Sequence, residues 1–200
     1  MRIILAAIFS VTLGVFAPFA KGATVSISQP AFTGVADFSP SGFGQSFTAN
    51  GDYLIVAIDL YVSSSSGGSD ATLRLYDFNS SLPALGASVL GIGTFFESDL
   101  NAVPQWVRVE LASPVPVVNG NEYAFTIVAK DPGGSATGWN NYGMNSSDVY
   151  SGGGRINVSP VSVRTTDLAF QVVTVPEPAP VSLALLGILL GINRRTRRPS

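Results

Sequence analysis

The 200-residue sequence contains no cysteine and no histidine. Without cysteine the chain cannot form disulfide bonds, and without either residue it cannot build the usual zinc sites. Nucleophilic sites in which a histidine activates a serine or a cysteine are excluded for the same reason. Of the common catalytic chemistries, only that of carboxylates remains open.

Positive charge is scarce in the middle of the chain. Six of the eleven basic residues lie near the two ends, and residues 23–175 carry five basic residues against twelve acidic ones, a formal charge of −7. A body with this charge repels the phosphate backbone of nucleic acids. The sequence therefore predicts no nucleic-acid partner.

The chain begins with the pattern of a secretory signal peptide. A short basic region with Arg2 precedes an apolar run over residues 3–16, which is the length of the hydrophobic region of such signals. Ala20 and Gly22 supply small residues at the −3 and −1 positions of a cleavage site. The sequence predicts a signal peptide over residues 1–22. An uncleaved N-terminal anchor is the alternative, which the shortness of the run disfavours.

The C-terminal 25 residues contain three successive features. They are the triplet Pro176-Glu177-Pro178, the apolar segment Val181–Ile192, and a cluster formed by Arg194, Arg195, Arg197 and Arg198. As a helix the apolar segment would be about 18 Å long, which is short of the ~30 Å hydrocarbon core of a bilayer. It suffices to hold the tail at the membrane for processing, with the arginines on the cytoplasmic side.

This order of features closely resembles the PEP-CTERM sorting signal of Gram-negative bacteria. The resemblance covers residues 176–200. It implies recognition by an exosortase, a membrane-embedded protease thought to cut at or near Pro176, Glu177 and Pro178, while the arginine cluster holds the orientation. It also implies export, a transient inner-membrane intermediate, and delivery to the cell surface or extracellular matrix of a species that makes exopolysaccharide. A simple tail-anchored protein is the alternative.

The body, residues 23–175, shows hydrophobic alternation with a period of two, which is typical of half-buried strands. The expected strands span residues 54–62, 72–77, 106–111, 121–129 and 167–175. In the first, the expected core face is Leu54, Val56, Ile58, Leu60 and Val62, with Asp59 and Tyr61 on the other face. Turn-forming segments such as residues 63–69 and 151–154 separate the strands. The pattern predicts one all-β domain, an antiparallel β-sandwich, with the jelly roll as the favoured form.

The same segments resemble a group of extracellular β-sandwich domains that often precede bacterial anchoring signals. The matching pieces are Gln45-Ser46-Phe47, Ile58–Tyr61, Leu73–Asp77, Trp106–Leu111, Gly120–Phe125 and Asp167–Phe170. Each piece is a core-and-turn pattern, so the resemblance supports the fold and implies little about a ligand.

Sugar binding is the most specific ligand hypothesis. Trp139, Asn140, Asn141 and Tyr142 lie between glycines, which predicts a loop that offers aromatic faces and amide groups to a glycan. The alternative is that Trp139 or Tyr142 fills one end of the sandwich. Trp106 is a weaker candidate, because it begins a strand and can cap the core.

Acidic residues in or beside turns leave a structural calcium ion open as a cofactor. They are Asp70, Asp99, Asp131, Asp148 and Asp167, and no ligand set among them stands out. No pair of carboxylates is marked as catalytic either. The sequence therefore predicts a non-catalytic protein without an obligatory cofactor. The resemblance of the C-terminal segment further implies an exported surface or matrix protein whose partners are the export machinery and an exosortase. The alternative is a glycan-binding module that associates with exopolysaccharide.

Overall fold

The computed structural model describes residues 22–37, 42–64, 70–81, 84–129, 140–158 and 160–176. Within these ranges the chain forms thirteen strands and one short 3-10 helix, η1 (Glu97–Asp99), which confirms the all-β class. The strands are β1 (Thr24–Gln29), β2 (Gly34–Asp37), β3 (Phe43–Thr48), β4 (Tyr53–Ser64), β5 (Ala71–Asn79), β6 (Ala84–Phe95), β7 (Gln105–Val117), β8 (Glu122–Ala129), β9 (Asn140–Asn145), β10 (Arg155–Val158), β11 (Val161–Val163), β12 (Asp167–Leu168) and β13 (Phe170–Pro176).

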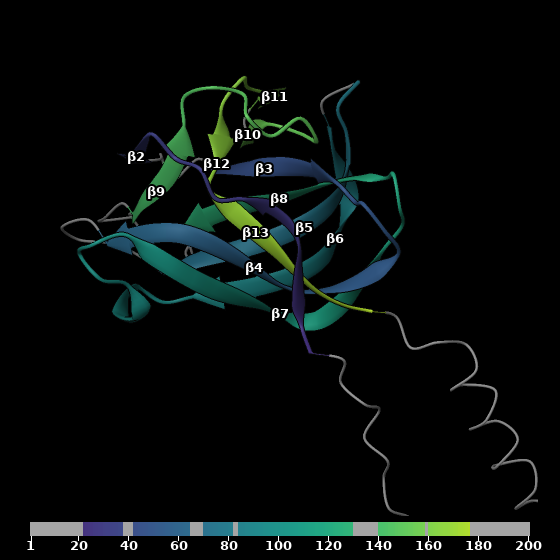
Figure 1. Cartoon of the computed structure of the whole chain (residues 1–200), viewed down its shortest axis with the longest axis horizontal. Coiled ribbons are helices and arrows are strands. Elements are labelled where there is room, and N and C mark those ends of the chain that lie inside the picture. The colour runs from purple at the N-terminus through teal and green to yellow at the C-terminus, as the bar shows by residue number, and fades with distance from the viewer. Residues whose placement is uncertain are drawn as a thin grey trace, which may run out of the picture.

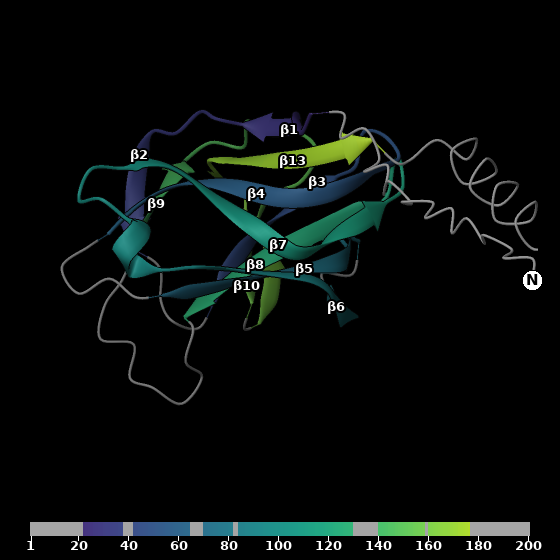
Figure 2. The ribbon, with the colours of Figure 1, turned by 90° about the horizontal axis from the view of Figure 1, so that it is seen from below.

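The strands form two antiparallel layers (Figures 1 and 2). Sheet 1 has the order β1-β13-β4-β7, with β9 beside the far end of β4 and with β2 and β12 paired to β9. Sheet 2 has the order β6-β5-β8-β3-β10-β11. One backbone pairing, Gly93 of β6 with Leu111 of β7, joins the two. The arrangement is consistent with a β-sandwich.

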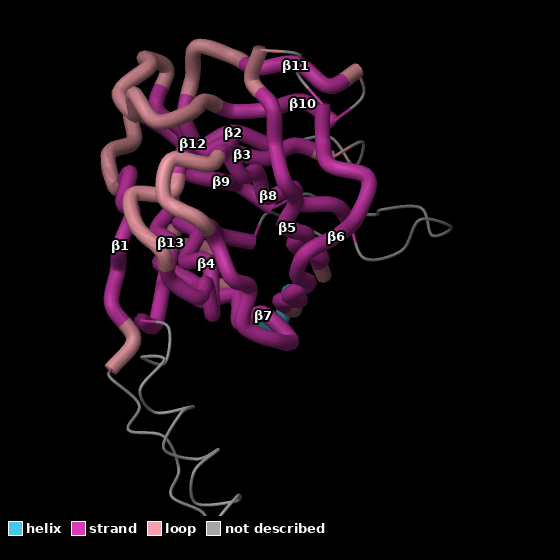
Figure 3. Tube along the Cα trace, turned by 90° about the vertical axis from the view of Figure 1, so that its right-hand side faces the viewer, coloured by secondary structure: helices cyan, strands magenta, loops and turns pink. Residues whose placement is uncertain are grey.

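The strand pairs are nested around the β5–β6 hairpin. Outside it, β4 pairs with β7, then β3 with β8, and then β2 with β9. Successive pairs alternate between the sheets: β5–β6 and β3–β8 lie in sheet 2, whereas β4–β7 and β2–β9 lie in sheet 1. The strands are magenta in Figure 3, which views this stack from its side.

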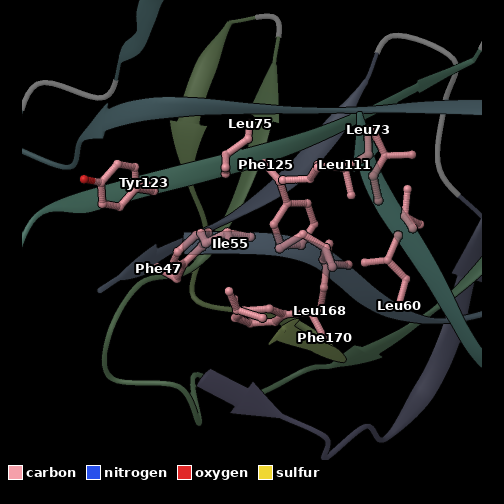
Figure 4. Packing of buried hydrophobic residues seen from close by; sticks show 14 of the residues in the cluster. Phe47, Ile55, Leu60, Leu73, Leu75, Leu111, Tyr123, Phe125, Leu168 and Phe170 are labelled. Carbon is pink, nitrogen blue, oxygen red and sulfur yellow. The ribbon is translucent and has the colours of Figure 1, made fainter. Parts of the chain in front are cut away.

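The core lies between the layers and is centred on three phenylalanines (Figure 4). The ring of Phe170 lies 5.6 Å from that of Phe125 and 6.3 Å from that of Phe47. The expected inward residues of β5, Leu73 and Leu75, are fully buried, as the alternation predicts. Phe47 and Phe125 come from sheet 2 and Phe170 from sheet 1, so this cluster holds the sheets together.

The predicted face of β4 is wrong in its first half. A bulge in the pairing with β7 falls between Ile55 and Ala57. A bulge adds one residue to a strand and so reverses which residues face the core. Leu54 and Val56 are therefore only half-buried, while Ile55 is fully buried. Beyond the bulge the alternation agrees with the prediction.

A buried polar pair also connects the sheets. Gln45 on β3 and Asp167 on β12 have no solvent exposure. The Gln45 Nε2 donates to Asp167 Oδ1 at 2.9 Å, and Gln45 Oε1 accepts from the backbone N–H of Leu168 at 2.9 Å. Asp167 Oδ2 accepts from the backbone N–H groups of Val149 and Tyr150, each at 2.9 Å. Burial is tolerated because every carboxylate oxygen has a donor.

We expect Asp167→Ala to lower the free energy of unfolding by about 3 kcal/mol, because it leaves a buried amide and two backbone N–H groups without an acceptor. Urea denaturation measures the change. Asp148→Ala removes an exposed carboxylate from the loop that carries Val149 and Tyr150. It should change the free energy of unfolding by less than about 0.5 kcal/mol. Equal effects of the two substitutions would contradict the structural role of Asp167.

Stability should also fall at alkaline pH. Burial raises the pKa of Tyr150 from 10.0 to about 12, and it raises the pKa of Tyr53 and Tyr142 as well. The unfolded chain loses these phenolic protons near pH 10 while the folded chain keeps them, so the stabilisation is complete below pH 10 and is lost as the pH rises toward 12. Tyr150→Phe should weaken this pH dependence in denaturant titrations above and below pH 10. An unchanged pH dependence would show that Tyr150 does not contribute.

Candidate functional site

The predicted sorting motif begins at the last strand. Pro176 is the final residue of β13, exposed and aligned with Tyr53 of β4, so the first residue of the triplet ends a strand. Strand termini accept proline because no further ladder hydrogen bond is needed there. Glu177, Pro178 and the arginine cluster lie outside the described residues. In the described part of the chain, no helix has the length and apolar character needed to cross a membrane.

The predicted sugar-binding segment is not an exposed loop where it is described. Asn140, Asn141 and Tyr142 form the start of β9, and Trp139 lies outside the described residues. Asn140 and Tyr142 are each only 5% exposed. The loop prediction is wrong for these three residues, because β9 pairs with β2, β4 and β12 and this pairing overrides the turn preference of asparagine and glycine.

Tyr142 packs in the core instead of facing solvent. Its ring meets the ring of Phe43 edge-on, with the centroids 4.8 Å apart. Burial raises the pKa of its phenol well above the ordinary value. This favours the alternative stated for the sequence, in which Tyr142 fills one end of the sandwich, over an exposed ring that contacts sugar.

Three other aromatic residues gather on the outer face of sheet 1, and we call them the aromatic strip: Phe32, Tyr61 and Trp106. The ring of Phe32 is stacked on that of Tyr61, with centroids 4.4 Å apart and planes at 29°. The ring of Trp106 lies 5.4 Å from Tyr61 on β4, where the two residues are aligned across the β4–β7 pair. Phe32 is 43% exposed and Trp106 40% exposed, with Tyr61 half-buried between them.

The position of Trp106 at the start of a strand suggests that it caps the core, but its side chain is exposed instead. Val107 and Val109 face inward, so the alternation of β7 places Trp106 outward with Arg108. The same alternation places Tyr61 outward with Asp59. The alternation of each strand predicts that Tyr61 and Trp106 point outward. The pairing of β4 with β7, which brings the two rings together, cannot be predicted from the sequence of either strand.

The polar neighbours of the strip come from the next cross-strand pair on the same face of the sheet, Asp59 and Arg108. Arg108 donates through Nε to Asp59 Oδ1 at 2.8 Å and through Nη2 to Asp59 Oδ2 at 2.9 Å. These bonds raise the pKa of Arg108 above its ordinary value. The side chain of Arg108 remains 48% exposed, so the two-bond pair contributes at most about 1 kcal/mol to stability. It does fix the guanidinium beside the aromatic strip.

The loop that carries Phe32 is held by side-chain hydrogen bonds. The amide of Gln29, which is buried at the end of β1, donates to the carbonyl of Ala31 at 3.0 Å and accepts from its N–H at 3.3 Å. The N–H of Thr33 donates to the carbonyl of Met144 at 3.0 Å. These bonds hold the backbone on both sides of Phe32.

The acidic residues considered for calcium are dispersed or engaged. Asp167 is the buried acceptor described above, and Asp99 Oδ2 accepts from the backbone of Phe96 at the start of η1. Asp131 lies outside the described residues. Among the described residues, no three or more acidic side chains gather where they could hold a metal ion.

Two features of the described chain can serve a function: the strand end at Pro176, from which the Pro-Glu-Pro tail departs, and the aromatic strip on sheet 1. The first contains a motif that is recognised in the sequence. The second is a surface formed by strand pairing, and the sequence alone does not predict it. A scan of the chain against models of known protein families finds no match, and a search among curated proteins finds no significant match.

Proposed function

We propose that the protein is a non-catalytic component of the bacterial cell surface or extracellular matrix, exported through residues 1–22 and sorted by an exosortase that reads Pro176, Glu177 and Pro178. The three-part C-terminal signal is the sequence support. The structural observation that carries the proposal is the position of the two junctions between body and targeting segments.

Both junctions lie at one pole of the sandwich (Figure 1). Thr24, at the start of β1, is aligned with Thr174 near the end of β13, and Pro176 is aligned with Tyr53 at the start of β4. We call this end the tether pole. A body held by either terminal segment would therefore rest on this pole, and its opposite end would face away from the membrane.

The exposed Pro176 fits a processing site. It is the last of the described residues that pairs in the sheet, and Glu177 and Pro178 follow it directly in the sequence. Proline before and after the glutamate disfavours helix. A membrane-embedded protease needs such an extended, accessible segment next to the bilayer.

We further propose that the body is a jelly roll. The support is the nested pairing of β5–β6, β4–β7, β3–β8 and β2–β9, whose members alternate between the sheets. This gives the orders β2-β9-β4-β7 and β3-β8-β5-β6, the arrangement expected of two interlocked Greek keys. Strands β1, β10, β11, β12 and β13 are additions to that frame.

The second candidate function is glycan binding, in association with exopolysaccharide. Asn140 and Tyr142 do not favour it, because they are buried. The aromatic strip does, because it offers solvent-exposed rings beside a fixed polar pair.

We expect the mature protein to lack Met1–Gly22 and most or all of Val181–Ser200. Glu177→Ala should leave a larger species in the inner membrane if the protease reads this carboxylate, because the apolar segment then stays attached. Cell fractionation and intact mass measure both effects in an exosortase-containing host. Asp148→Ala, an exposed acidic residue of the body, is the matched control and should be processed normally. A surface-located wild-type product that still carries Arg194–Arg198 would contradict the sorting proposal and favour a tail anchor.

A further inference from the structure

We propose that the aromatic strip is a binding surface for an uncharged polysaccharide, and that it lies at the end of the body away from the tether pole. In its biological setting the inference rests on the proposed export, since the polymer would be met outside the cell. The binding itself is a property of the body's surface and is tested separately.

The position of the strip follows from the register of β4. Tyr53 begins β4 at the tether pole, where it is aligned with Pro176, and Tyr61 lies eight residues further along the strand. At ~3.3 Å per residue this places the strip about 25 Å from the tether pole. Trp106 is aligned with Tyr61, and β9 joins β4 just beyond it. A tethered body would thus turn the strip outward.

The chemistry of the strip suits the flat face of a pyranose ring. The C–H bonds on that face carry partial positive charge and match the negative face of an aromatic ring. Phe32 and Trp106 offer the exposed surface, and the half-buried Tyr61 separates them. Two exposed rings on one surface can contact different sugars of an extended chain. Arg108 and Asp59 form the next cross-strand pair on the same face, two residues along each strand, where they can meet hydroxyl groups at the edge of the sugar.

Charge favours an uncharged polymer over an acidic one. Residues 23–175 carry a formal charge of −7, which opposes the approach of a polyanion. The cation next to the strip, Arg108, already donates through Nε and Nη2 to Asp59. Its positive charge is therefore paired with the Asp59 carboxylate, which would repel a carboxylated sugar and not a neutral one.

Gly143 positions the central ring. A Cβ added at Gly143 would lie 2.8 Å from Tyr61 Cδ1, its nearest neighbour, and 3.3 Å from both Tyr61 Cβ and Ala169 Cβ, so glycine leaves room for the Tyr61 side chain to lie across β9. The Gly143 carbonyl also accepts from the N–H of Ala169 at 2.8 Å. Gly143, which follows the segment where a sugar site was expected, therefore makes room for Tyr61 of the aromatic strip on the neighbouring strand β4.

The test is a depletion isotherm of the full chain on insoluble cellulose, chitin, β-1,3-glucan and mannan, with alginate as the acidic comparison. The chain is kept in a polyoxyethylene detergent, because detergents with sugar headgroups would compete. We expect binding to at least one neutral polymer, loss of at least about tenfold in affinity for Trp106→Ala, and retention in Trp106→Phe. Ile92→Ala removes an exposed apolar side chain from the outer face of sheet 2 and should bind as the wild type does.

Several results would overturn the proposal. They are no binding to any neutral polymer, tighter binding to alginate than to all of them, an equal loss in Ile92→Ala, and no loss in Trp106→Ala. Light scattering tests whether the strip binds a second copy of the chain. A wild-type dimer that Trp106→Ala converts to a monomer would assign the strip to self-association and contradict the proposal. Thermal unfolding of each variant checks that the fold is intact. Defective sorting of the Glu177→Ala variant and defective binding of Trp106→Ala are independent readouts, so either proposal can fail alone.

We expect Gly143→Ala to weaken polysaccharide binding by about threefold to tenfold, because it displaces Tyr61 without touching either exposed ring. The double variant Gly143→Ala with Tyr61→Ala removes the clash as well as the ring. If Gly143 acts only through Tyr61, the double variant should bind no worse than Tyr61→Ala alone. A further loss in the double variant would show that Gly143 has a structural role separate from the strip.

Discussion

The carboxylate of Asp167 is the constraint on which the arrangement of the two sheets depends. A charge without solvent exposure is strongly unfavourable unless donors surround it. Here Gln45 donates to it from sheet 2, and the backbone N–H groups of Val149 and Tyr150 donate to it from the loop between β9 and β10. These bonds are directional, unlike the contacts of the phenylalanine core, and they admit one relative position of β3, β12 and the loop. The short β12 can then lead into β13 with Phe170 in the core.

Much of the fold could be predicted from the sequence, because strand alternation is local. In β5 and β7 the inward residues follow the period of two, and Leu73, Leu75 and Val109 are buried as expected. In β4 the prediction of Leu54 and Val56 as core residues was wrong. The β-bulge that reverses the face depends on how β7 aligns with β4, and no feature of the β4 sequence alone reports that alignment.

The candidate site was harder to predict, because it is made by pairing. Asparagines and glycines around Tyr142 are typical of a loop, yet partners on both edges make the segment a strand. Conversely, Tyr61 and Trp106 are far apart in sequence, and each alone resembles an ordinary outward residue of a strand. The register of β4 with β7 makes them neighbours, and the hydrogen bonds of Gln29 and Thr33 hold Phe32 beside them. Gln45 and Asp167 belong to two separate sequence motifs, and their buried hydrogen bond is likewise seen only in the folded chain.

The pairing of β1 with β13 has a consequence for the timing of folding. Thr24 and Thr174 are aligned, so the first strand of the body can find its partner only when the last strand is available. Closing a loop of this length slows folding more than it weakens the native state. In a chain that crosses a membrane from its N-terminus, β1 would wait unpaired until nearly the whole body had emerged. The sheet would then be completed only as the apolar C-terminal segment arrived at the membrane.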